Sequence, residues 1–191
     1  MKRHNKLNTL LILLTAGLIA LACSGSYQTT EANKIVDQAN KKLDEAKELY
    51  TKTDKRNEEL FSANIQTLPQ LAYYKSQKES EAKAIVADFE KVAGMLKEIS
   101  RLFDDVSRMN LDEKYKDYAK LKSDEFAKRA EAVDIRKGNA QAFMDIDYPK
   151  TMIAKFDENN SKSDRLFKDA EDIAAKAKKI EDDNKEIFKQ A

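Results

Sequence analysis

A series of apolar residues spaced alternately three and four positions apart constrains the fold of this chain most strongly. This spacing places side chains on one face of an α-helix, whereas a half-buried β-strand would alternate apolar and polar residues. Between residues 82 and 106 every position of the series is apolar, and its members are Ala82, Ile85, Phe89, Val92, Leu96, Ile99, Phe103 and Val106. The segment from about Gln70 to Met109 is therefore predicted to form a long helix that packs on one side.

Three further segments show helical spacing. The first follows Thr29 and Thr30, which are expected to cap it, and runs to about Ile65 with polar residues at two positions of its apolar face. The third is expected to begin near Leu111, with Asn110 as its cap and Glu113 as the reciprocal capping residue. Its apolar stripe is less regular, and the sequence Lys-Gly-Asn at 137–139 is a point at which it could bend or break. The fourth runs from Pro149 to about Phe188 and is expected to continue through the polar residues 157–164.

Four helices of similar length with short connections predict an all-α, elongated, up-down-up-down four-helix bundle with coiled-coil-like packing, because short connections force neighbouring helices to run antiparallel. The composition agrees, since 36% of the residues are charged and only 4 glycines and 2 prolines are present. We assign residues 31–191 to this single domain. Its distal end is defined as the end that carries the turns near Pro69 and Pro149.

The N-terminus has the pattern of a secretory signal. Lys2, Arg3 and Lys6 precede 13 residues, Leu10 to Ala22, that are apolar apart from Thr15. This run is long enough for the core of a signal peptide and shorter than the roughly 20 residues that span a bilayer. We therefore expect a signal peptide at residues 1–22 and export from the cytoplasm.

Cys23, the only cysteine, follows this segment directly, and the sequence Leu21-Ala22-Cys23 resembles the lipobox of bacterial lipoproteins. The resemblance implies that the leader is cut before Cys23 and that the cysteine carries lipid, which anchors the protein to a membrane of the cell envelope through a linker at residues 23–30. Ser24 resembles the residue found in lipoproteins sorted to an outer membrane, where the organism has one. An ordinary secretory leader with a chance cysteine is the alternative.

The residues needed for several kinds of chemistry are missing from the part of the chain after the leader. The only histidine is His4, which lies in the leader, so a Ser-His-Asp or Cys-His arrangement is excluded there. Zinc sites and di-iron bundle sites that depend on histidine are excluded for the same reason. Three of the 35 basic residues lie in the leader and all 34 acidic residues follow it, so the chain after the leader carries a net charge of −2. Such a charge does not attract nucleic acid. We expect no enzyme activity, no cofactor, no metal and no nucleic-acid partner.

Polar residues on the predicted helix faces come together at one level near the distal end. Thr53 and Asn57 lie about as far from that end as Asn159 and Ser163 do, when the helices are laid antiparallel. The neighbouring segments bring further polar side chains to this level, and the predicted polar layer consists of Thr53, Asn57, Lys75, Lys78, Arg136, Asn139, Asn159 and Ser163. Buried polar groups need partners, so the layer either fixes the register of the helices, holds water or binds a polar or anionic ligand.

Three functions remain open after these considerations. The first is a lipid-anchored structural or protein-binding bundle of the cell envelope, whose exposed tyrosines at Tyr73 and Tyr74 would suit an interface. The second is a binding module for a small polar or anionic ligand in the polar layer. The third is an amphipathic protein whose helices open onto lipid. We favour the first, with an envelope protein as partner.

Overall fold

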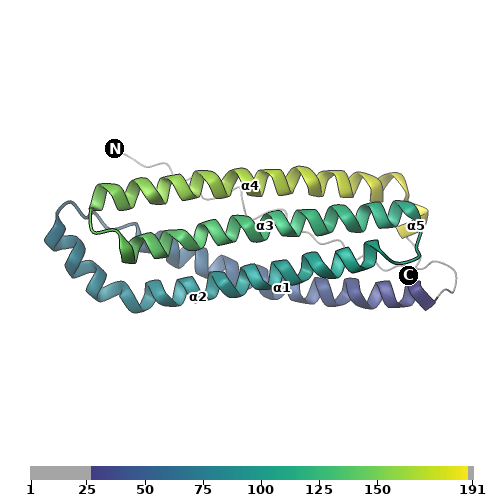
Figure 1. Cartoon of the computed structure of the whole chain (residues 1–191), viewed down its shortest axis with the longest axis horizontal. Coiled ribbons are helices and arrows are strands. Elements are labelled where there is room, and N and C mark those ends of the chain that lie inside the picture. The colour runs from purple at the N-terminus through teal and green to yellow at the C-terminus, as the bar shows by residue number, and fades with distance from the viewer. Residues whose placement is uncertain (1–26, 189–191) are drawn as a thin grey trace.

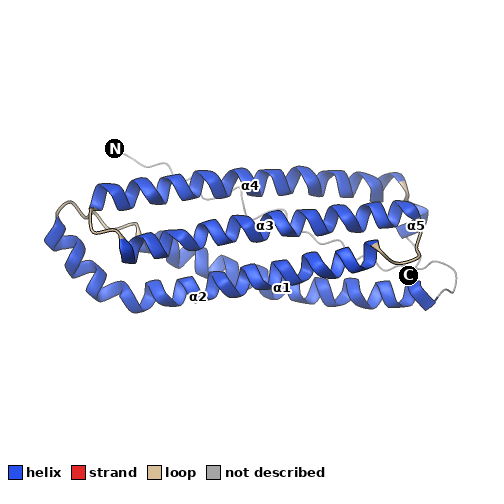
Figure 2. Ribbon diagram, viewed as in Figure 1, coloured by secondary structure: helices blue, strands red, loops and turns tan. Residues whose placement is uncertain are grey.

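A computed structural model describes residues 27–188 as a bundle of four long helices and one short one (Figures 1 and 2). The turns that join α1 to α2 and α3 to α4 lie together at the distal end, on the left of Figure 1. The turn from α2 to α3 lies at the opposite, proximal end, and so does α5. The helices are α1 (Tyr27–Leu60), α2 (Leu68–Ser107), α3 (Glu113–Asp145), α4 (Pro149–Asp183) and α5 (Lys185–Phe188). The predicted all-α, up-down-up-down bundle is confirmed.

The apolar face of α2 forms a large part of the core. All eight residues of the predicted series, from Ala82 to Val106, are at most 5% exposed. Phe103 stacks on Phe126 of α3 with ring centroids 5.8 Å apart, and Phe89 lies 6.1 Å from the ring of Tyr50 of α1. Burial of each of these large side chains contributes about 1.5–3 kcal/mol to folding, so the packing of α2 stabilises the bundle substantially.

α3 is the central helix, because it packs along its length against both α2 and α4. A helix with two close neighbours buries a wider face than a single stripe, and here that face includes charged and polar residues: Ser123, Glu125, Arg129, Arg136 and Asn139. This arrangement explains why the apolar stripe of α3 is irregular in sequence. The helix also continues without a break through Gly138, where the sequence allowed a bend.

α1 is held differently from the other helices. Its backbone approaches that of α2 closely at many positions, whereas close approaches between the backbones of α1 and α4 are rare. Large side chains fill the wider gap: Phe61, just after α1, stacks on Phe156 at 4.2 Å, and Tyr50 packs edge-on against Phe167 at 5.8 Å. The contact between α1 and α4 therefore depends on a small number of side chains.

The helix boundaries correct several expectations. α1 begins at Tyr27 and ends at Leu60, so Thr29 and Thr30 lie inside it and the predicted linker at 23–30 overlaps its first turn. The cap of α3 is Asp112 and not Asn110, because the Asp112 carboxylate accepts a hydrogen bond from the backbone N–H of Lys114 at 2.8 Å. A carboxylate at this position also complements the positive end of the helix dipole.

The ends of α2 and α4 lie close to the predicted positions. α2 begins at Leu68, where Thr67 and Gln70 form a reciprocal capping box before the first turn that contains Pro69. The polar residues 157–164 are helical, as predicted, and α4 ends at Asp183, before the short helix α5. Phe188 of α5 is buried against Tyr115 and Tyr118, so α5 closes the proximal end of the core.

The predicted signal peptide and Cys23 lie outside the residues that the structure describes. Within residues 27–188, no helix combines the length and the apolar character that a membrane span requires.

Candidate functional site: a buried polar layer

Six of the eight residues predicted to form the polar layer are buried side by side in the distal half of the bundle. They come from α1, α3 and α4, and each is at most 6% exposed: Thr53, Asn57, Arg136, Asn139, Asn159 and Ser163. We call these six residues the polar layer. Along each helix the two members are three or four positions apart, so they form two rungs separated by about one helical turn of 5.4 Å.

The first rung is organised by Arg136, and we call it the arginine rung. The Arg136 guanidinium donates through Nε to Ser163 Oγ at 3.2 Å and through Nη1 to Asp54 Oδ1 at 3.3 Å. Its Nη2 donates to Asp164 Oδ1 at 2.7 Å. Thr53 completes the rung, and its hydroxyl donates to the backbone carbonyl of Leu49 at 2.8 Å. One arginine of α3 thus links α1 to α4 across the side of the bundle where those two backbones are far apart.

Burial dominates the electrostatics of this rung. It raises the pKa of the Asp54 carboxyl above its ordinary value, since desolvation outweighs the lowering effect of Arg136, and the Asp164 charge raises it further. Burial also raises the pKa of the Tyr50 hydroxyl, which lies near the same charges. The two carboxylates together exceed the single positive charge of Arg136, so the rung offers no unpaired cation to an anionic ligand.

The second rung contains Asn57, Asn139 and Asn159, and we call it the asparagine rung. Asn139 Nδ2 donates to Asn160 Oδ1 at 2.9 Å, which ties α3 to α4. Four other amide atoms are buried without a hydrogen-bond partner: both Nδ2 and Oδ1 of Asn57, Oδ1 of Asn139 and Nδ2 of Asn159. Since unpaired buried polar atoms are costly, this rung is the least satisfied part of the core.

α2 closes the asparagine rung with a small side chain. Tyr50 of α1 contacts Phe89 of α2, and seven residues towards the distal end from this pair lie Asn57 on α1 and Ala82 on α2. Seven residues are two helical turns, so Ala82, which is fully buried, faces the level of the asparagines. Alanine cannot hydrogen-bond through its side chain, so α2 supplies no side-chain partner for the unpaired amide atoms.

An aromatic cluster separates the asparagine rung from the distal turns. Phe61 lies between Phe156, which it stacks on at 4.2 Å, and Phe143, which it meets edge-on at 6.0 Å. Tyr74 of α2 packs edge-on against Phe143 at 5.8 Å. Phe143 is fully buried and Phe61 is 5% exposed. The asparagine rung therefore lies between this aromatic cluster on its distal side and the arginine rung on its proximal side.

Lys75 and Lys78, the other two predicted members, have different roles. Lys75 Nζ donates to the Met144 carbonyl and to Asp147 Oδ1, both at 2.9 Å, and so caps the C-terminal end of α3. Lys78 pairs at 2.6 Å with Glu81 on the surface of α2. α2 bends in its first turns (Figure 1) and buries no side chain between Leu71 and Ala82, which explains why these lysines do not enter the layer.

Sequence reasoning missed the partners of the layer and a second buried polar cluster. Asp54, Asp164 and Asn160 stand one position away from the predicted polar positions, and that adjacency was the available signal. The second cluster belongs to α3 alone: Glu125 accepts from Arg129 Nε at 2.8 Å and from Lys122 Nζ at 2.6 Å. Its i, i+3 and i, i+4 spacing could have revealed it, although such pairs usually lie on solvated surfaces.

The exposed large apolar side chains of the described part of the chain gather at the distal end. They are Leu68 (50% exposed) and Tyr73 (69%) at the start of α2, and Tyr148 (64%) just before α4. Tyr74, which we also expected at the distal turn, instead packs on Phe143 and its hydroxyl reaches the Glu59 carbonyl at 3.5 Å. Leu68, Tyr73 and Tyr148 together are called the distal patch below.

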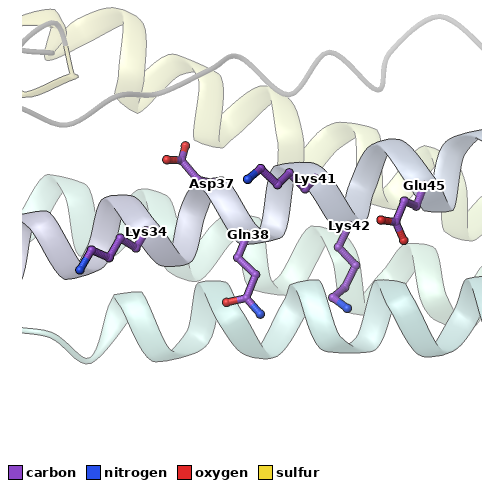
Figure 3. A pocket seen from close by; sticks show the side chains of 6 residues that line it. All are labelled: Lys34, Asp37, Gln38, Lys41, Lys42 and Glu45. Atoms are coloured by element: carbon purple, nitrogen blue, oxygen red, sulfur yellow. The ribbon is translucent and has the colours of Figure 1, made fainter.

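A shallow hollow lies on α1 in its proximal half (Figure 3), and its lining side chains are Lys34, Asp37, Gln38, Lys41, Lys42 and Glu45. Gln38 and Lys42 point towards α2, where Lys42 pairs with Glu98 at 2.9 Å. The side chains are exposed or half-buried and of both charges, as on an ordinary solvated helix face. Within residues 27–188 no three acidic, histidine or cysteine side chains are grouped as metal ligands would be.

Comparison with known proteins adds no relative to this description. No family model matches the sequence, and searches of curated proteins and of solved structures return no match.

Proposed function

We propose that this protein is a lipid-anchored protein of the bacterial cell envelope that uses its distal end to bind a partner protein. The observation that carries the proposal is the distal patch, because exposed aromatic residues are favoured at protein interfaces. Leu68, Tyr73 and Tyr148 come from the beginnings of two helices and are brought to one end of the bundle by the fold.

The position of the patch relative to the anchor supports the proposal. The lipid would be attached at Cys23, four residues before α1 begins at the proximal end. α1 has 34 residues, which corresponds to about 50 Å at 1.5 Å per residue. Two or more acyl chains on Cys23 would hold the proximal end at the membrane. The bundle would then present the distal patch about 50 Å from the bilayer surface, within reach of another envelope protein.

The remaining surface supports a spacer role for the helices. Ion pairs one helical turn apart are frequent on it, as in the pairs Glu48–Lys52, Glu79–Lys83 and Glu158–Lys162. Such exposed pairs contribute little to stability but keep a helix face solvated. A rod with polar sides and one apolar end is suited to binding at that end, and we assign the protein no catalytic role.

Site-specific photo-crosslinking in cells tests the proposal. A photoreactive amino acid is placed at position 73 or 148 in the distal patch, and, as a matched control, at exposed Lys91 in the middle of α2. We expect the same discrete adduct from positions 73 and 148, its loss when the other tyrosine of the patch is replaced by alanine, and no such adduct from position 91. Identical adducts from all three positions, or none from the patch, would refute the binding role.

A further inference from the structure

The unpaired amides of the asparagine rung point to a bound molecule. Asn57 and Asn139 have no exposed surface and Asn159 is 6% exposed, yet these three side chains leave four polar atoms without a partner. Native cores satisfy nearly all such atoms, with protein groups or with ordered molecules that the core encloses. The three residues belong to α1, α3 and α4 and lie at one level of the bundle, so the unpaired atoms come from three different helices.

Charge excludes an anion as the occupant. The arginine rung lies about one helical turn from the asparagines, and in it Asp54 and Asp164 both bond to Arg136. The sum of these charges is negative, and all three nitrogens of the guanidinium donate to protein acceptors. An anion would meet a net repulsive field with no free cation, so the anionic ligand that the sequence allowed is not supported here.

The unpaired atoms define the hydrogen bonds that the occupant makes. Two of them are acceptors, Oδ1 of Asn57 and Oδ1 of Asn139, and two are donors, Nδ2 of Asn57 and Nδ2 of Asn159. Reversing the amide of Asn57 exchanges its own two atoms and leaves the numbers of donors and acceptors unchanged. The complementary molecule therefore donates and accepts in equal measure, which is a property of uncharged polar molecules.

The walls of the rung limit the size of the occupant. Ala82 leaves more room on the α2 side than any larger core residue would. On the opposite side α3 and α4 are in close contact, because a Cβ atom at Gly138 would stand 3.1 Å from Asn159 Nδ2. The aromatic cluster and the arginine rung close the two remaining directions. These neighbours restrict the occupant to a small molecule.

We propose that the asparagine rung is a binding site for a small uncharged molecule that both donates and accepts hydrogen bonds. Ordered water and a small primary amide share this chemistry. The bound molecule joins Asn57 on α1 to Asn139 and Asn159, and it thereby completes the contact between α1 and the α3–α4 pair. This site is separate from the distal patch, so it stands or falls independently of the proposed function.

A crystal structure of the mature protein at about 1.5 Å, grown without amide or polyol additives, tests the proposal, because individual waters are resolved at such resolution. We expect electron density within hydrogen-bonding distance of at least three of the four unpaired atoms. Isolated single-atom peaks identify water, and a connected planar peak identifies an amide carried through purification. Direct amide-to-amide hydrogen bonds with no density between the side chains would overturn the proposal.

Magnetic relaxation dispersion of water oxygen measures the same site in solution. If water is the occupant, the Asn57→Leu variant loses the long-lived water signal of the wild type, whereas the control variant Asn64→Leu, in the exposed turn after α1, keeps it. If an amide is the occupant, native mass spectrometry finds its added mass on the wild type and not on Asn57→Leu. The proposal would be contradicted if wild type and Asn57→Leu gave the same result in both measurements. The wild-type crystal structure decides the question even if Asn57→Leu does not fold.

Discussion

Replacing Arg136 with methionine is expected to destabilise the bundle strongly. The substitution keeps the aliphatic part of the side chain and removes three hydrogen bonds, to Asp54, Ser163 and Asp164. Asp54 is left largely buried, since its side chain is 21% exposed, whereas Asp164 is 53% exposed and can be hydrated. Breaking a buried pair by removing one partner costs about 3–5 kcal/mol. Because one of the two carboxylates is half-exposed, we expect a loss at the lower end, about 3 kcal/mol.

Urea unfolding monitored by far-UV circular dichroism measures this loss. About 3 kcal/mol corresponds to a fall in Tm of about 6–12 °C for a domain of this size. Arg165→Met is the matched control, because Arg165 is an exposed arginine of α4, and its effect is expected to stay within about 0.5 kcal/mol. The double variant Arg136→Met with Asp54→Asn is expected to recover part of the loss, since it removes the unpaired charge. An Arg136→Met variant as stable as Arg165→Met would refute the role of the arginine rung.

The pH dependence of the same variant provides an independent check. Burial raises the pKa of Asp54 in the folded state above its ordinary value of 3.8, so the protonated carboxyl favours the folded state. This contribution to the free energy of unfolding is fully present below about pH 3.8. That contribution is lost as the pH rises through the raised folded-state pKa. Arg136 lowers the pKa of Asp54, so in Arg136→Met this pKa is higher still, and more of the unfolding free energy is lost as the pH rises. The difference in unfolding free energy between wild type and Arg136→Met is therefore expected to shrink as the pH falls from about 7 to about 4. A constant difference would contradict this reasoning.

Three further predictions concern the core, a helix cap and the distal patch. Phe89→Ala leaves a cavity in the fully buried face of α2 and is expected to lower the unfolding free energy by about 3–5 kcal/mol in urea titrations. Thr67→Ala removes the capping box of α2 and is expected to cost about 1 kcal/mol in the same titrations, whereas Thr67→Ser retains most of it. Tyr73→Ala combined with Tyr148→Ala is expected to change stability by less than about 1 kcal/mol, because both side chains are exposed, while abolishing partner adducts from a photoreactive residue at position 68.

The fold could be predicted from the sequence because spacing and connection length are local properties. The series from Ala82 to Val106 is regular, so α2 and its buried face followed directly, and the polar residues 157–164 kept the phase of α4. The start of α1 and the cap of α3 could not be placed as well. Asp112 and Asn110 are both good capping residues, and the choice between them depends on how the chain leaves α2.

The polar layer could be predicted only in part. The burial of Thr53, Asn57, Asn159 and Ser163 followed from their positions on the apolar faces, combined with the antiparallel arrangement. The bend at the start of α2 is a tertiary feature, and it moved Lys75 and Lys78 out of the layer. Asp54 and Asp164 were missed because they flank the seam, and a long arginine on a third helix brings them into one network.

The anchor at Cys23 is the central claim of the proposed function, because the distal patch is presented away from the membrane only if the proximal end is attached to it. Mass spectrometry of the protein isolated from membranes, with Cys23→Ser in parallel, tests it most directly. We predict an acylated N-terminal peptide that begins at Cys23 in the wild type and no acylated peptide in the variant. A wild-type protein in the soluble fraction with an unmodified N-terminus would contradict the account.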